Sequence, residues 1–150
     1  MEGLKIAAGS DHAGLILKRA LIAHLESLGA QVLDLGTHSE ESCDYPNYAK
    51  LVCEKVQSGE VQKGVLCCGS GIGISIAANK FRGIRCALCH DYYTATMSRE
   101  HNDANIIAIG ERVTGVDVAK QMVEKFMTTP FMVDHPNHSR RVGQINSFSS

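Results

Sequence analysis

Five short apolar runs alternate with longer segments of helical periodicity, and this alternation limits the folds open to the chain. The runs span residues 5–8, 31–35, 64–68, 85–89 and 106–109. Several are almost continuously apolar, as expected of parallel strands that are buried on both faces. We therefore predict an α/β protein, a doubly wound three-layer sandwich of Rossmann-like type, with a five-stranded parallel sheet in the order 2-1-3-4-5.

The segments between the runs carry apolar stripes at helical spacing. Leu17, Leu21, Leu25 and Leu28 fall on one face of a helix, which we expect to end at Gly29. Further helices are expected over residues 45–58, from 91 to 101, around 119–126 and after Pro136. With no repeat and no linker, we expect one domain over residues 1–150.

Composition and net charge limit the kinds of molecule that the chain is expected to bind. The chain has 44% hydrophobic residues and a formal net charge of −1, which gives no electrostatic reason to expect binding to nucleic acid or to a membrane. The N-terminal sequence lacks the basic-then-apolar pattern of a signal peptide, and no apolar run is long enough to span a bilayer. We expect a cytoplasmic protein.

Six cysteines raise the question of disulfides or a metal site. A disulfide framework is not expected in a chain of this length without a secretion signal. Cys86 and Cys89 lie three residues apart on an expected strand, so their side chains point to opposite faces and do not form a zinc site. Most of the thiols are expected to be buried apolar residues in a reducing compartment.

A glycine-rich turn follows the third apolar run. It reads Cys68, Gly69, Ser70, Gly71, Ile72 and Gly73. The spacing is not that of a dinucleotide-binding turn, and the lysine of a P-loop is absent. The glycines either serve only tight strand-to-helix packing or form a nest of backbone N–H groups that binds an anion. Because adjacent strand residues face opposite ways, we expect Cys68, and not Cys67, to reach the turn.

A thiol at this position is either an inert buried side chain or a base made usable by the helix N-terminus. Polar residues also follow the other strands, at the sheet edge where such folds bind ligands. Each has a structural alternative, as a cap, a turn or a solvated charge. Those after the strands are Asp11, His12, Asp44, Tyr45 and Arg112. Further candidates are His101 and Asn102, at the end of an expected helix, and Arg140 and Arg141 near the C-terminus.

At these residues the chain resembles the type B ribose-5-phosphate isomerases, a family that also contains the subunits of galactose-6-phosphate isomerase. The resemblance covers nearly the whole chain. It rests on residues 9–14, 44–46, 68–80, 83–85, 98–105 and 110–113.

The resemblance implies an aldose–ketose isomerase that interconverts ribose 5-phosphate and ribulose 5-phosphate without a metal or organic cofactor. Cys68 matches the family's base, and His101 matches the acid–base that opens the sugar ring. The backbone N–H groups between Gly69 and Gly73 are suited to stabilise an enediolate, and Ser70 to move or orient a proton between sugar oxygens.

The other matching residues imply contacts to the sugar phosphate. Asp11 is expected to hold a hydroxyl or assist ring opening, and Tyr45 and Asn102 to contact hydroxyl groups. The phosphate is expected at His12, Arg112 and Arg141. The family also implies a homodimer or a dimer of dimers in which neighbouring subunits share sites.

One departure concerns the phosphate end. Asn137 stands where the family often has an arginine, so either Arg140 or a histidine substitutes for it, or the phosphate is held differently. A six-carbon substrate, allose 6-phosphate or galactose 6-phosphate, is therefore an alternative. A flavodoxin-like domain that only binds a phosphorylated ligand, and a non-catalytic subunit, are the others.

Overall fold

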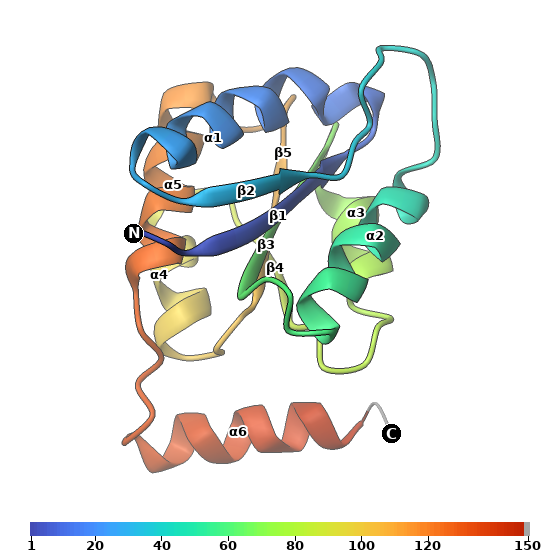
Figure 1. The fold of residues 1–150 in the computed structure, drawn as a ribbon. Helices are drawn as coiled ribbons and strands as arrows, with labels where there is room; N and C mark the ends of the chain where they lie inside the picture. Colours follow the sequence, from blue (N-terminus) through green and yellow to red (C-terminus); the bar gives the residue numbers. More distant parts are fainter. Residues whose placement is uncertain (149–150) are drawn as a thin grey trace.

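The computed structural model describes residues 1–148, which form alternating strands and helices in three layers (Figure 1). The strands are β1 (Lys5–Ser10), β2 (Gln31–Asp34), β3 (Lys63–Cys68), β4 (Cys86–Leu88) and β5 (Ile106–Gly110). The helices are the 3₁₀ turn η1 (His12–Gly14) and α1 (Leu15–Ser27), α2 (Tyr45–Gln57), α3 (Ile72–Ala78), α4 (Tyr92–Glu100), α5 (Val116–Thr128) and α6 (Pro136–Ser147). The predicted fold class is confirmed, and the predicted strands are all present, with ends shifted by a residue or two.

The sheet is parallel, in the order β2-β1-β3-β5-β4. The predicted order 2-1-3-4-5 is therefore wrong for its last two strands. All residues of β5 are buried, between β3 and β4, whereas β4 has only three residues and Ala87 and Leu88 are half-buried. The longer and more continuously apolar strand, β5, takes the interior position because it can be covered on both faces.

Two hydrophobic cores lie on the two faces of the sheet. On one face α1, α4 and α5 pack around Val65, Cys67 and Phe126. On the other face α2 and α3 pack around Leu66 and Cys68. Successive residues of β3 thus point to opposite cores, as the pleat of a strand requires.

Helix α6 lies apart from the two helical layers (Figure 1). Of its residues only Val142 is buried, whereas Ile145 and, just after the helix, Phe148 are exposed. A hydrogen bond of 3.0 Å from Arg85 Nη1 to Asn146 Oδ1 links the helix to the start of β4. None of the helices described here is long and apolar enough to cross a membrane.

Candidate active site

A pocket of about 500 Å³ lies at the carboxyl edge of the sheet. It collects residues that follow β1, β3 and β5, together with the first residue of α2. The lining residues are Asp11, His12, Ala13, Tyr45, Cys68, Gly69, Ser70, Ile72, Gly73, Arg112 and Val113. Nine of them are sequence-predicted site residues, so the turn after β3 meets polar residues that follow β1, β2 and β5.

Cys68 ends β3 and brings a thiol to the pocket wall. Its sulfur accepts a hydrogen bond of 3.2 Å from the backbone N–H of Gly71. Cys67, one residue earlier, faces the opposite core, where burial raises the pKa of its thiol. Of the two adjacent cysteines only Cys68 lines the pocket, as predicted.

The turn after β3 is held in a fixed shape by its neighbours. Gly71 has a φ of 77°, a conformation that favours glycine. A Cβ at Gly110 would lie 2.5 Å from the backbone of Ser70, so β5 and the turn are in direct backbone contact. The amide N–H of Ile72 donates to the Ser70 hydroxyl oxygen over 3.1 Å, which leaves the hydroxyl proton free to donate.

Asp11 and His12 follow β1. One carboxylate oxygen of Asp11 accepts the N–H groups of Ala13 and Gly14, at 2.9 and 3.1 Å, so the residue is a helix cap as well as part of the pocket. His12 Nδ1 accepts the backbone N–H of Cys43 at 3.2 Å. Neutral His12 therefore carries its proton on Nε2.

Tyr45 and Arg112 complete the walls. A Cβ at Gly73 would lie 2.6 Å from the Tyr45 hydroxyl, so the tyrosine lies directly over the turn. A Cβ at Gly69 would lie 3.1 Å from Nη1 of Arg112, which brings a cation to the start of the turn. Asp44 is the exposed N-cap residue of α2 and does not line the pocket.

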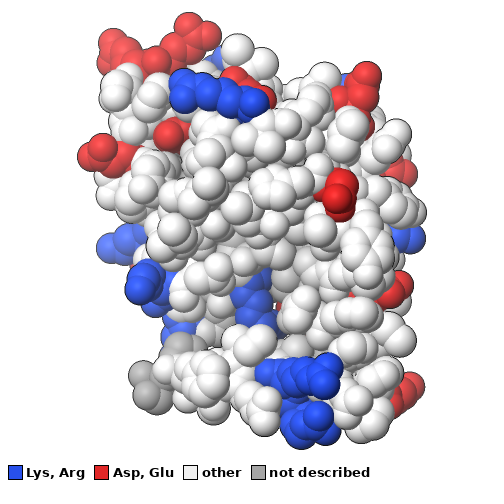
Figure 2. All heavy atoms as spheres, turned by 180° about the vertical axis from the view of Figure 1, so that it is seen from behind, with Lys and Arg blue, Asp and Glu red and all other residues white. Residues whose placement is uncertain are grey.

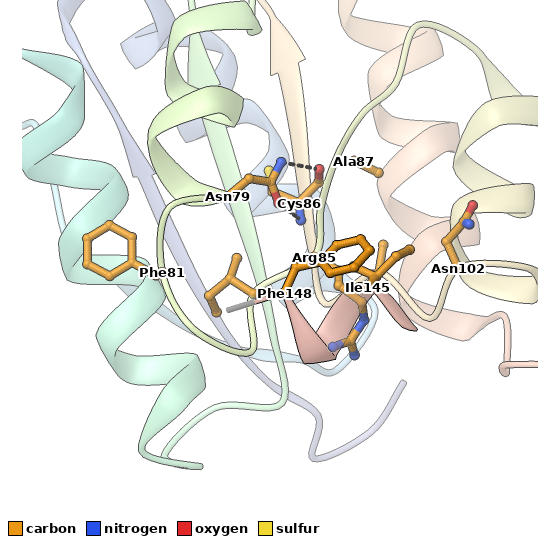
Figure 3. Close-up of a pocket in the computed structure, with 10 residues that line it drawn as sticks. Asn79, Phe81, Arg85, Cys86, Ala87, Asn102, Ile145 and Phe148 are labelled. Carbon is orange, nitrogen blue, oxygen red and sulfur yellow. Dashed lines mark hydrogen bonds between the residues drawn. The ribbon is translucent and has the colours of Figure 1, made fainter. Parts of the chain in front are cut away.

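A second set of predicted residues lies elsewhere, around the end of α4 and along α6. Asn102 lines a different pocket, of about 550 Å³, together with Arg85, Ile145 and Phe148 (Figure 3). None of the residues in this set lines the pocket of Cys68. The set comprises His101, Asn102, Asn137, Arg140 and Arg141.

The second set is rich in positive charge. Helix α6 contains Arg140 and Arg141 and no acidic residue. Figure 2 shows basic side chains concentrated toward the end of the molecule where α6 lies in Figure 1. Arg140 Nη1 donates to Asn137 Oδ1 over 3.1 Å. Arg140, a candidate to replace the family's arginine, is therefore in contact with Asn137, which stands at that arginine's position.

Some contacts at the site were not predicted from the sequence. Lys18 is fully buried and donates to Asp34 at 2.5 Å and to the carbonyl of Thr37 at 2.7 Å, which anchors the loop that brings Cys43 to His12. A lysine within the otherwise apolar stripe of α1 was the available signal. Over residues 1–148, no group of three His, Cys, Asp or Glu side chains is arranged to hold a metal ion.

The chain is similar to known proteins over nearly its whole length. A model of the family described as Ribose/Galactose Isomerase matches residues 6–145. Ribose-5-phosphate isomerase B of Escherichia coli (strain K12) is 48% identical over 143 residues, which cover 95% of each chain. The galactose-6-phosphate isomerase subunit LacB of Clostridium acetobutylicum is 40% identical over 126 residues, covering 84% of this chain and 73% of that one.

Solved structures of ribose-5-phosphate isomerase B also resemble this chain. Ribose-5-phosphate isomerase B of Clostridium thermocellum superposes with a TM-score of 0.93 at 50% identity, covering 97% of each chain. The similarity therefore extends over nearly the whole of residues 1–148, including the separate helix α6.

Proposed function

We propose that this chain, which belongs to the Ribose/Galactose Isomerase family, interconverts D-ribose 5-phosphate and D-ribulose 5-phosphate. Family membership makes it an aldose–ketose isomerase. The observation that carries the proposal is the Cys68 sulfur at the pocket wall, hydrogen-bonded to the N–H of Gly71 at 3.2 Å. An aldose–ketose isomerase needs a base that lies beside fixed hydrogen-bond donors.

Cys68 is the proposed base. Isomerisation requires that a proton leave C2 of the aldose and return to C1, without net loss or gain of electrons. A thiolate stabilised by the Gly71 N–H can accept that proton, and the resulting thiol can return it. In this proposal side chains and backbone supply the chemistry, with no metal or organic cofactor.

The intermediate is an enediolate, whose negative charge requires donors already in position. Two N–H groups of the turn are occupied within the turn, because Gly71 donates to Cys68 and Ile72 to Ser70. The N–H groups of Ser70 and Gly73 are the proposed donors to the enediolate. The Ser70 hydroxyl, oriented by Ile72, then donates to or passes a proton between the sugar oxygens.

Ring opening is assigned to His101, and the site is proposed to be shared between two copies of the chain. His101, Asn102 and Arg141 lie outside the pocket of Cys68 in their own chain. Helix α6 buries only Val142, and Ile145 and the following Phe148 are exposed, which suits a face that a second copy covers. A homodimer, or a dimer of dimers, would supply these groups to the neighbouring pocket.

The phosphate end is proposed to lie against His12 and Arg112, with Arg141 or Arg140 from the second copy. The His12 tautomer supports this assignment, because Nδ1 is occupied by Cys43 and Nε2–H is free to donate to an anion. In the same proposal Asp11 and Tyr45 contact sugar hydroxyl groups.

A matched pair of cysteine variants tests the proposal. Cys68→Ala should lower kcat on ribose 5-phosphate by about 10²–10⁴-fold, the usual contribution of a general base. Cys67→Ala removes a thiol one residue away on the other face and should retain most of the activity. Near-normal turnover by a folded Cys68→Ala protein would show that the base is another group.

A six-carbon sugar phosphate is the second candidate substrate. It is favoured by the relative named as a galactose-6-phosphate isomerase subunit and by Asn137 in place of the family's arginine. Comparison of kcat/KM for ribose 5-phosphate, allose 6-phosphate and galactose 6-phosphate decides between them. We expect the pentose to have the highest value, and a higher value for either hexose would replace the proposed substrate.

A further inference from the structure

Three imidazole rings stack at the junction between α4 and α6. The ring centroids of His101 and His138 are 4.1 Å apart, with planes inclined by 17°. His138 and His135 follow at 4.0 Å and 30°. His138 is therefore the middle ring, with one imidazole on each side.

Backbone contacts hold the junction in which the stack forms. His101 is the C-cap residue of α4, and its N–H donates to the carbonyl of Met97. His135 is the N-cap residue of α6, and the intervening chain is tied back to α4 by a 3.1 Å hydrogen bond from Met132 N to the Glu100 carbonyl. The spacing of the rings is thus set by two helix ends and a short, tethered connection.

The outer ring, His135, has no other evident role. Its side chain makes no cap hydrogen bond at the start of α6. Its Nδ1 is buried and has no hydrogen-bond partner within the described residues. The interaction that the structure shows for this side chain is the contact with His138, and the unpartnered buried nitrogen opposes the placement and does not explain it.

The middle ring tends to be uncharged. The pKa of His138 is lowered first by desolvation, and then by the positive charges of His135, His101 and Arg141. These three charged or titratable groups lie at the start of α6, at the end of α4 and on α6 itself. A neutral aromatic plate therefore covers one face of His101 near neutral pH.

We propose that His138 and His135 are positioning residues for His101, acting as two successive aromatic plates that fix the plane of its ring. The proposal rests on the proposed function, in which His101 opens the sugar ring. Stacking restrains rotation of the imidazole but leaves its two nitrogens at the ring edge, where proton transfer takes place. Acid would place a positive charge on His138 directly against His101.

Phenylalanine and alanine variants separate the plate from the titrating group. His138→Phe keeps an aromatic plate and should retain kcat on ribose 5-phosphate within about 2-fold, whereas His138→Ala should lose about 10-fold. His135→Phe and His135→Ala should show the same order with smaller losses. His38→Ala, at an exposed imidazole outside the stack, is the control for loss of a histidine.

Two further measurements distinguish a loss of His101 positioning from general structural damage in the stack variants. D-erythrose 4-phosphate cannot close a furanose ring, because its 4-oxygen carries the phosphate, so its turnover should be insensitive to all four stack variants. On the acid side, the decline of activity due to protonation of His138 should be absent in His138→Phe. Equal losses on both sugars, or equal losses for the Phe and Ala variants, would overturn the proposal.

Different results would contradict the ring-opening role of His101 and the positioning role of His135 and His138. If His101→Asn has no effect on ribose 5-phosphate, the ring-opening assignment is wrong. If His101→Asn is impaired but both alanine variants of the stack match wild type, only the positioning role is wrong. NMR titration of the imidazole Cε1–H signals in the ligand-free protein adds a measurement independent of activity: His135→Phe should raise the pKa of His138, and an unchanged value would contradict the contact.

Discussion

At the scale of single residues, the direction in which a side chain points decides whether it belongs to the core or to the pocket. Cys67 and Cys68 are adjacent and chemically identical, but one enters the core beneath α1 and α5 and the other reaches the pocket. The same alternation separates Cys86 from Cys89, which lie in opposite cores as predicted. A strand periodicity of two is thus sufficient to choose the candidate base and to reject a zinc site.

The contact between Gly73 and Tyr45 gives a prediction at this scale. Gly73→Ala puts a methyl group where the Tyr45 hydroxyl now lies, so the tyrosine must swing away from the turn. We expect kcat/KM on ribose 5-phosphate to fall by about 10–100-fold with little change in Tm, because a misplaced wall affects alignment more than stability. Gly115→Ala, which meets no atom within 4 Å, is the control, and equal activities for the two variants would contradict the assignment.

Sequence patterns predicted which residues line the pocket, but they did not predict the hydrogen bonds that join distant residues around it. The continuous apolar runs and the glycine turn identified β3, Cys68 and the edge of the sheet, because strand burial and turn geometry are local properties. The hydrogen bond from Cys43 to His12 and the buried pair of Lys18 with Asp34 join residues far apart in sequence. No local pattern specifies such pairs, since each depends on how the loop after β2 folds back.

At the scale of elements, the position of β5 beside β3 determines which loops meet. The N–H groups of Glu111 and Arg112 donate to the carbonyls of Cys68 and Gly69, at 2.9 and 3.0 Å. With the order predicted from the sequence, β4 would separate these loops, and Arg112 would not lie over the turn. The continuously apolar sequence of residues 106–109 was the signal for a central position, but the run at residues 85–89, of similar length, competed for it.

The contact between β5 and the turn can be tested through stability. Gly110→Ala introduces a Cβ 2.5 Å from the backbone of Ser70, which cannot move as a side chain end would. We expect a loss of about 3 kcal/mol in the free energy of unfolding, from overpacking. Urea denaturation measures the loss. Gly143→Ala, at an open position on α6, should be neutral or stabilising, and a Gly110→Ala protein as stable as wild type would show that the contact is looser than described.

At the scale of the whole molecule, the buried thiols link stability to pH. Burial raises the pKa of Cys53 to about 12 and that of Cys89 to about 11, and it raises the pKa of Cys67 and Cys86 as well. These thiols remain protonated in the fold but ionise near pH 8.5 in the unfolded chain. The unfolded chain then binds fewer protons, so stability should fall as the pH rises from about 8.5 towards 11.

Cys53→Ala should remove one thiol's share of this alkaline loss, at most about 1.4 kcal/mol per pH unit. Urea unfolding of the reduced protein between pH 8 and 10.5 measures the slope. Cys43→Ala, which removes a half-exposed thiol, is the matched control. An identical slope in wild type and in Cys53→Ala would mean that the buried thiol does not contribute.

A shared site makes a second prediction for the whole molecule. Cys68→Ala and His101→Asn chains should each be nearly inactive, but mixed dimers would contain one pocket with both residues intact. Random association should restore about a quarter of wild-type activity, since half of the dimers are mixed and each has one intact site of two. Co-refolding of equal amounts followed by an assay measures this recovery. Activity no greater than the sum of the separate variants would place His101 and Cys68 in one chain's site or outside a common site.

The central claim is that Cys68 moves the proton of an aldose–ketose isomerisation. The most direct measurement is the isomerisation of ribose 5-phosphate in D₂O, followed by NMR of the sugar carbon that receives the proton. Wild type and Cys67→Ala should incorporate deuterium at C1 of ribulose 5-phosphate, and in Cys68→Ala both exchange and product formation should be slower by about 10²–10⁴-fold. Deuterium incorporation and product formation by Cys68→Ala at the wild-type rate would contradict the account.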